Sequence, residues 1–163
     1  MNDAPPSKTL QRLASVVNGV LSGDGDLAIT DIVYDSRLVE PGALFVAMPG
    51  GYADGHEYIE QAIHRGAAAI MVQQPGDYAV PAIVVGDSRA ALSPLAAEFF
   101  DHPSRALKVV GVTGTDGKTS TSTLAEAMLG VAGYSTGLIG TVQIKIGDDI
   151  GTQESLLMSP RAY

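Results

Sequence analysis

A glycine-rich segment in the last third of the sequence constrains the fold more than any other feature. Residues 111–119 read Gly-Val-Thr-Gly-Thr-Asp-Gly-Lys-Thr. A short run rich in β-branched residues precedes this segment, and apolar residues at helical spacing follow it. A strand, a tight glycine turn and a helix N-terminus in this order direct successive backbone N–H groups at one anion. The segment therefore predicts a phosphate-binding loop between a strand and a helix.

The residues on either side of the loop predict a buried strand and a largely buried helix. The apolar residues of the strand are Leu107, Val109, Val110 and Val112. The helix repeats Leu124, Ala127, Met128 and Val131 on one face and carries Ala125, Leu129 and Ala132 on its flank. Gly133 stands where a left-handed C-terminal cap is expected.

Two residues at the end of the loop suit phosphate chemistry. In phosphate loops the lysine, here Lys118, reaches the β- and γ-phosphates of a nucleotide, and the next hydroxyl, here Thr119, is a ligand of Mg²⁺. The generic pattern, however, has glycine at the position of Val112, and Gly111 lies one residue too early. The alternative is a glycine-rich turn between strand and helix with an incidental lysine.

The composition excludes several classes of protein. The 163 residues with 45% hydrophobic content suffice for one domain or two small ones, and the absence of cysteine excludes disulfides and thiolate metal sites. A net charge of -8 argues against sequence-independent binding to nucleic acid or to anionic lipid. Residues 1–11 lack the apolar core of a signal peptide, and no apolar run is long enough to span a bilayer. We expect a cytoplasmic monomer without nucleic-acid or membrane partners.

The first hundred residues alternate between strand and helix patterns, which indicates an α/β fold. Strands are expected at 28–34, 44–47, 68–72 and 82–85, and helices through Leu10, Leu13, Val16 and Val17, at 56–65, and through Leu92, Leu95, Ala96 and Phe99. Pro94 either kinks the last helix or lies in its first turn after a Ser93 cap. Turn-forming residues at 101–104 predict a domain boundary, with domains at 1–104 and 105–163.

The loop sequence Thr-Gly-Thr-Asp-Gly-Lys-Thr resembles the ATP loop of the Mur ligase family. That loop usually reads Thr-Gly-Thr-Asn-Gly-Lys-Thr and also lacks the early glycine. The resemblance implies that ATP and Mg²⁺ are the cofactors, that Lys118 and Thr119 are catalytic, and that Thr119 is the metal ligand. The implied nucleotide-binding residues are Gly114, Thr115, Asp116, Gly117, Lys118, Thr119 and Ser120. Asp116 replaces the usual asparagine, and its negative charge beside phosphate predicts a lower nucleotide affinity.

Four strings in the first hundred residues strengthen the resemblance. They are Asp-Ser-Arg at 35–37, Pro-Gly-Ala-Leu-Phe-Val-Ala at 41–47, Gly-Gly-Tyr-Ala-Asp-Gly-His at 50–56, and the segment 61–72. Each alone fits an ordinary turn or helix entry. Together, in this order and followed by the ATP loop, they resemble the N-terminal domain that binds UDP in two Mur ligases. One of these adds the third residue of the peptidoglycan stem peptide, and the other is the next ligase of that pathway.

The resemblance implies an α/β fold in two parts. Residues 1–104 would form the N-terminal domain that binds UDP-MurNAc-peptide, with a Rossmann-like mixed sheet. Residues 105–163 would supply only the first strand, the phosphate loop, its helix and a hairpin at 142–149 of an ATPase central domain. Because one strand cannot bury both faces of a parallel sheet, we read the chain as an N-terminal fragment of a longer protein. Alone, it is expected to be inactive and to bind ATP weakly or not at all.

The resemblance also implies substrate-binding residues. Ser36 stands where the family contacts the UDP-muramoyl substrate, Tyr34 lies near the uracil, and the loop of Gly51, Tyr52 and Ala53 holds the nucleotide. Ser159, in Met-Ser-Pro at 158–160, falls in a second substrate motif. Arg37 has two interpretations, as a partner of phosphate or as a structural partner of Asp35.

The implied activity is ATP-dependent addition of diaminopimelate or lysine to UDP-MurNAc-L-Ala-D-Glu through an acyl phosphate, a step of cell-wall synthesis. The runner-up is the next ligase, which adds a dipeptide and whose loop tends to carry serine at position 115. Thr115 and Gly140-Thr141 favour the third-residue ligase. A truncated, non-catalytic module that binds UDP-sugar or nucleotide is the alternative from another class.

Overall fold

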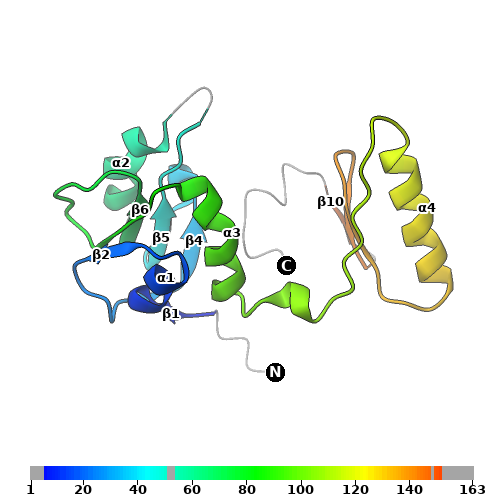
Figure 1. Cartoon of the computed structure of the whole chain (residues 1–163), viewed down its shortest axis with the longest axis horizontal. Helices are drawn as coiled ribbons and strands as arrows, with labels where there is room; N and C mark the ends of the chain where they lie inside the picture. Colours follow the sequence, from blue (N-terminus) through cyan, green and yellow to red (C-terminus); the bar gives the residue numbers. More distant parts are fainter. Residues whose placement is uncertain (1–5, 51–53, 148, 152–163) are drawn as a thin grey trace. The chain divides into compact units, whose positions relative to one another are not determined.

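The structure, a computed structural model, describes residues 6–50, 54–147 and 149–151. The described residues fall into two compact units, divided between Leu107 and Lys108 (Figure 1). The boundary that we predict after residue 104 lies close to this division. The two units are described separately below.

The first unit is built on a five-stranded sheet with the order β2-β7-β6-β5-β4. The strands β4 to β7 run parallel to one another, and β2 is antiparallel at the edge beside β7. Their bounds are β2 Val20–Ser22, β4 Asp31–Val33, β5 Ala43–Val46, β6 Ala69–Val72 and β7 Ala82–Val84. The short strands β1 (Lys8–Thr9) and β3 (Ala28–Ile29) form a separate antiparallel pair. The predicted α/β fold with a mixed sheet is confirmed.

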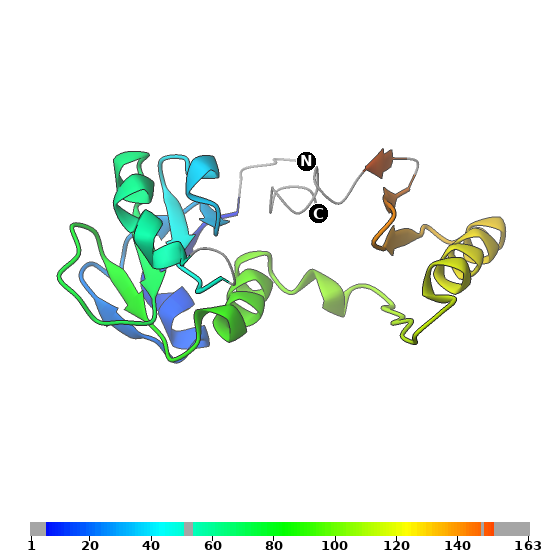
Figure 2. The same ribbon diagram turned by 90° about the horizontal axis from the view of Figure 1, so that it is seen from above.

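Three α-helices cover this sheet, with α1 and α3 on one face and α2 on the other (Figure 2). Their bounds are α1 Leu10–Val16, α2 Ile59–His64 and α3 Ser88–Phe99. Three 3₁₀ turns accompany them, η1 Ser36–Leu38, η2 Gly55–Tyr58 and η3 Pro103–Arg105. None of the helices within the described ranges has the length and the apolar character that crossing a bilayer would require.

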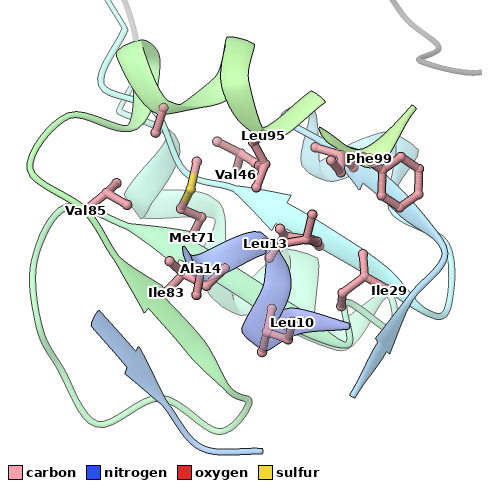
Figure 3. Packing of buried hydrophobic residues seen from close by; sticks show 14 residues of the cluster. Leu10, Leu13, Ala14, Ile29, Val46, Met71, Ile83, Val85, Leu95 and Phe99 are labelled. Carbon is pink, nitrogen blue, oxygen red and sulfur yellow. The ribbon is translucent and has the colours of Figure 1, made fainter. Parts of the chain in front are cut away.

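The core lies in two layers because successive residues of a strand face opposite sides of the sheet. Leu44 and Val46 of β5 pack on the side of α1 and α3, where Leu13 and Leu95 meet them (Figure 3). Phe45 points to the opposite layer, which α2 covers. Every residue of β5 and β6 is buried. Burial on both faces is typical of parallel strands, and it explains their uninterrupted apolar sequences.

Several element boundaries differ from the sequence prediction. The expected strand at 28–34 is two strands, β3 and β4, interrupted at Thr30. The expected helix at 56–65 begins as the 3₁₀ turn η2 and continues as α2. The other strands deviate by a residue at one or both ends, which is the usual uncertainty of such boundaries.

The last helix of the first unit, α3, begins earlier than the apolar spacing predicts. The Asp87 carboxylate accepts hydrogen bonds from the backbone N–H groups of Arg89 and Ala90 and therefore caps the helix. Pro94 consequently lies inside the helix, and the alternative with a Ser93 cap is wrong. The earlier cap prevails because it satisfies two backbone donors that would otherwise lack partners.

The second unit consists of the helix α4 (Lys118–Val131) and a three-stranded antiparallel sheet. The strands, in the order β10-β9-β8, are β8 Gly137–Ile139, β9 Ile144–Ile146 and β10 Asp149–Gly151. The predicted helix and the predicted hairpin are confirmed. Gly133 has the expected positive φ of 86°, and the N–H of Tyr134 donates to the carbonyl of Leu129 to close the helix.

Two expectations for the second unit are wrong. The segment before the loop is not a strand, and Val109 and Val110 are 74% and 78% exposed. The helix α4 is not largely buried either, since Met128 and Val131 are 71% and 92% exposed. A strand forms only when another strand supplies ladder hydrogen bonds, and no described strand pairs with residues 107–113. Among the described residues, no parallel sheet covers Met128 and Val131 of α4, which therefore remain exposed.

The double-layered core predicts a large difference between two substitutions in the first unit. Phe99→Ala removes a side chain that is 1% exposed, so we expect the free energy of unfolding to fall by about 3–5 kcal/mol. Val20→Thr changes an exposed strand residue and should alter it by less than about 0.5 kcal/mol. Urea denaturation followed by far-UV circular dichroism measures both. Equal effects would contradict the described core.

Candidate nucleotide and substrate sites

The glycine-rich loop ends in a backbone conformation that starts the helix. Gly117 has φ 74° and ψ 0°, which is left-handed, and α4 begins at Lys118. Gly114 has φ 149°, a value that other residues rarely adopt. Gly117 is the N-cap residue of α4, and no side chain makes a cap hydrogen bond to the first N–H groups of the helix. Such N–H groups, with the helix dipole, favour an anion.

Lys118 folds back over the loop in this structure. Its ammonium group donates to the carbonyl oxygens of Gly114 at 2.6 Å and of Thr115 at 3.1 Å. The positive charge is therefore held against the carbonyl oxygens of the glycine-rich loop. Lys118 and the first N–H groups of α4 belong to the same short segment of chain, which suits charge-assisted binding of phosphate.

The remaining predicted loop residues, Asp116, Thr119 and Ser120, are exposed. The described residues contain no cluster of three or more histidine, cysteine, aspartate or glutamate side chains that could hold a metal. The exposed Thr119 hydroxyl is one oxygen that this loop could offer to a hard cation. Mg²⁺ fits such a site, because it usually keeps several waters and takes few protein oxygens beside those of substrate phosphates.

The predicted substrate residues of the first unit lie just beyond the carboxyl end of β4. Tyr34 follows the strand and is 43% exposed, whereas Ser36 is 6% exposed. The Ser36 hydroxyl donates to Gln61 Oε1 of α2 at 2.7 Å. Because its one proton is engaged, Ser36 can offer a ligand only acceptor lone pairs. Gln61 was not predicted as a site residue, although it begins one of the four strings that carry the resemblance.

Arg37 pairs with Asp35, as the structural interpretation predicts. Arg37 Nη2 lies 2.6 Å from Asp35 Oδ2, and the Asp35 carboxylate also accepts from the backbone N–H of Arg37. These hydrogen bonds lower the pKa of Asp35 below its ordinary value, although partial burial acts in the opposite direction. The pair fixes the turn η1 that carries Ser36.

The nucleotide loop predicted at Gly51, Tyr52 and Ala53 lies outside the described residues, and so does Ser159. The residues that flank 51–53 are well held. Pro49 and Asp54 form an antiparallel bridge, and Arg89 Nη2 donates to the carbonyl of Pro49 at 2.9 Å.

His56 links the Asp54 end of this loop to the sheet. Its Nδ1 lies 2.6 Å from Asp54 Oδ1, and its Nε2 accepts from the backbone N–H of Gln73 at 3.1 Å. The ring therefore carries its proton on Nδ1. Hydrogen bonds from the backbone N–H and then the ring of His56 lower the pKa of Asp54. Sequence reasoning gave His56 only a helix-entry role, because Gln73 is distant in the sequence.

Two domain models of one family match most of the chain. The model described as "Mur ligase family, catalytic domain" matches residues 28–100, and "Mur ligase middle domain" matches residues 112–162. The first ends shortly before the division between the two units, and the second begins at the second residue of the glycine-rich segment 111–119. The α/β protein with a candidate phosphate loop therefore belongs to the Mur ligase family.

Curated relatives carry the names of peptidoglycan precursor ligases. A UDP-N-acetylmuramyl-tripeptide synthetase from Roseiflexus sp. is 52% identical over 137 residues, which are 82% of this chain and 27% of that protein. A UDP-N-acetylmuramoyl-L-alanyl-D-glutamate--2,6-diaminopimelate ligase from Listeria innocua is 44% identical over 80% of this chain and 27% of its own length. The chain thus spans about a quarter of the curated relatives it matches.

Solved structures agree with the fold. A MurF structure from Acinetobacter baumannii matches with TM-score 0.66 and 30% identity over 78% of this chain and 29% of its own. A MurF ligase from Thermotoga maritima in complex with ADP matches with TM-score 0.53 and 33% identity over 62% of this chain and 23% of its own. A 2,6-diaminopimelate ligase structure with TM-score 0.71 and 21% identity, over 91% of this chain and 30% of its own, supports the fold alone.

The left-handed conformation of Gly117 predicts a selective effect of alanine in the loop. Gly117→Ala should destabilise the start of α4 by about 1–2 kcal/mol, because a residue with a Cβ is strained in the left-handed conformation. The added Cβ itself would meet no neighbouring atom. Gly111→Ala, where φ is not positive and space is also open, is the matched control. Hydrogen exchange of the Thr121 amide, which donates to Gly117, reports the change. Equal exchange rates in the two variants would contradict the loop geometry.

Proposed function

We propose that this chain belongs to an ATP-dependent ligase that adds the third amino acid, diaminopimelate or lysine, to UDP-MurNAc-L-Ala-D-Glu. The observation that carries the proposal is the loop at residues 113–119. It closes on the N-terminus of α4 in a chain whose relatives include a tripeptide synthetase and diaminopimelate ligases. The ADP complex of a similar solved structure supports ATP as the phosphoryl donor.

In this proposal the chain acts as the N-terminal part of a longer cytoplasmic enzyme and is inactive alone. The first unit binds the UDP-MurNAc-peptide, and the second begins the domain that binds ATP. The exposed apolar residues Val109, Val110, Met128 and Val131 support this division of the protein. They have the spacing of a buried strand and helix, and further chain would cover them.

The proposed reaction has two steps. The terminal carboxylate of the UDP-MurNAc-dipeptide attacks the γ-phosphorus of ATP, and an acyl phosphate and ADP form. The amine of the third amino acid then attacks the acyl carbon, loses a proton and expels inorganic phosphate, which leaves an amide bond. Catalysis of phosphoryl transfer consists mainly of positioning and charge stabilisation.

The described residues have distinct tasks in this reaction. The N–H groups at the start of α4 bind phosphate oxygens. Lys118 exchanges the carbonyl oxygens of Gly114 and Thr115 for phosphate oxygens, a stronger charge-assisted contact, and neutralises the transferring group. Thr119 would hold Mg²⁺, whose charge offsets that of the phosphates.

The first unit supplies the other substrate contacts. The carboxyl ends of parallel strands are the usual place for ligands in open α/β sheets, and Tyr34 and Ser36 lie there. Ser36 would accept a hydrogen bond from an N–H or O–H of the substrate, because its own proton is donated to Gln61.

The second candidate is the next ligase of the pathway, which adds a dipeptide. MurF is the type of ligase that adds the dipeptide, and the matches to MurF structures at 30% and 33% identity favour this candidate. The higher identity to the tripeptide synthetase and the diaminopimelate ligases favours addition of a single residue. An assay of the longer protein with diaminopimelate, lysine and D-alanyl-D-alanine, each with its cognate UDP-MurNAc-peptide acceptor, separates the two.

Removal of the loop lysine tests the nucleotide site. Lys118→Ala should lower the turnover number of the longer protein by about 100-fold or more, because the transferring phosphoryl group loses its positive partner. Binding of UDP-MurNAc-dipeptide, measured by calorimetry, should survive, since that substrate binds the other unit. Near-normal turnover in this variant would refute the role of Lys118.

Removal of the loop aspartate should have the opposite effect on ATP. Asp116→Asn removes a negative charge near bound phosphate, so we expect the KM for ATP to fall about threefold or more. Asp77→Asn makes the same charge change at an exposed position of the first unit and is the control. An unchanged or higher KM in Asp116→Asn would show that Asp116 does not weaken nucleotide binding.

A further inference from the structure

Glu126 is the one acidic side chain that the second unit buries among its described residues. It lies on α4 and is 9% exposed. The neighbouring positions of the helix carry alanine, methionine and leucine, most of them exposed. A buried carboxylate in such a helix needs partners, because desolvation opposes its charge.

The partners of Glu126 come from the sheet that follows the helix. Thr136 Oγ1 donates to Glu126 Oε1 at 2.7 Å, and Lys145 Nζ donates to the same oxygen at 2.9 Å. Thr136 directly precedes β8, and Lys145 lies in β9. The contact with Lys145, and then that with Thr136, lowers the pKa of Glu126. We name Glu126, Thr136 and Lys145 the clamp.

Among the described residues, few buried apolar contacts fix the position of α4 on the sheet of β8, β9 and β10. The buried apolar residues of the described second unit are Leu138 and Ile144, both from the sheet, and α4 contributes none. Apolar contacts tolerate small slides and rotations, whereas a doubly hydrogen-bonded carboxylate does not. A rotation of the helix by one residue, about 100°, would carry Glu126 away from both donors.

We propose that Glu126, held by Thr136 and Lys145, is a positioning residue that sets the place of the phosphate-loop helix on the sheet of β8, β9 and β10. It lies two turns beyond Lys118, about 12 Å along the helix axis, and so acts through the helix. The clamp joins the helix that begins at the candidate nucleotide loop to the sheet of β8, β9 and β10. Its effect on catalysis rests on the proposed function; its effect on the packing of α4 does not.

A double-mutant cycle on this chain tests the packing. Glu126→Gln keeps the shape but loses the charge, and Lys145→Met removes the other charge. Each single variant should speed amide hydrogen exchange in α4 and β9 about tenfold. The double variant should speed exchange only slightly more than the larger single variant, because all three variants lose the same interaction. Glu60→Gln, an exposed glutamate of α2, is the control for charge. Additive effects, or none, would overturn the proposal.

The pH dependence separates charge from shape. The folded pKa of Glu126 is lowered, so the clamp is intact above the ordinary glutamate value of 4.5 and is lost as pH falls through the folded pKa. Lys145 is the charged group that faces Glu126. Exchange in α4, taken relative to the intrinsic rate of an unprotected amide at each pH, should therefore accelerate below about pH 4.5 in the native chain but not in Glu126→Gln. The same acceleration in both would contradict the clamp.

A kinetic comparison in the longer protein tests the link to the nucleotide site. Glu126→Gln should raise the KM for ATP and lower kcat, together about tenfold in kcat/KM, and leave the KM for the UDP-MurNAc-peptide unchanged. Glu126→Asp, which keeps the charge, should recover part of the loss. Wild-type kinetics in Glu126→Gln would overturn the positioning role. If the native protein does not ligate, the proposed function fails while the exchange test still decides the packing.

Discussion

The requirement that a parallel sheet be covered on both faces governs both units of this chain. The first unit meets it, because β4, β5, β6 and β7 place alternate residues under α1 and α3 on one side and under α2 on the other. The second unit does not meet it among its described residues: the apolar segment before the loop has no strand beside it, and it remains exposed. Burial of both faces thus explains the ordered sheet of the first unit, and the lack of a described partner strand explains why residues 107–112 do not form a strand.

The candidate sites follow from how strands end. Asp35, Asp54 and Asp87 each cap a helix or 3₁₀ turn that comes after a parallel strand, and each accepts the backbone N–H two residues later. Because parallel strands end at one edge of a sheet, these caps set the turns beside which Tyr34 and Ser36 lie. In the second unit the N-cap residue is the left-handed Gly117, which has no side chain to accept hydrogen bonds from the helix. The N-terminus of α4 is therefore open to an anion.

The parts that the sequence predicts best are those determined by neighbours along the chain. The alternating elements, α4 and its Gly133 cap, and the pairing of Arg37 with Asp35 all depend on residues close in sequence. Contacts between distant residues escaped prediction: Gln61 on Ser36, Gln73 on His56, and Lys145 on Glu126. The strand at 107–112 was predicted from its own residues, but its formation depends on strands that the local pattern does not contain. The single glutamate among the apolar residues 124–131 was a usable signal for the clamp.

Transfer of isotope from the substrate carboxylate to phosphate tests the central claim most directly. The longer protein would receive UDP-MurNAc-L-Ala-D-Glu with ¹⁸O in the terminal carboxylate, ATP and the third amino acid, and the released phosphate would be analysed by mass spectrometry. Ligation through an acyl phosphate predicts one ¹⁸O atom in each phosphate, because the carboxylate oxygen that attacks phosphorus leaves with it. Amide product accompanied by unlabelled phosphate, or ATP cleavage without amide, would contradict the account.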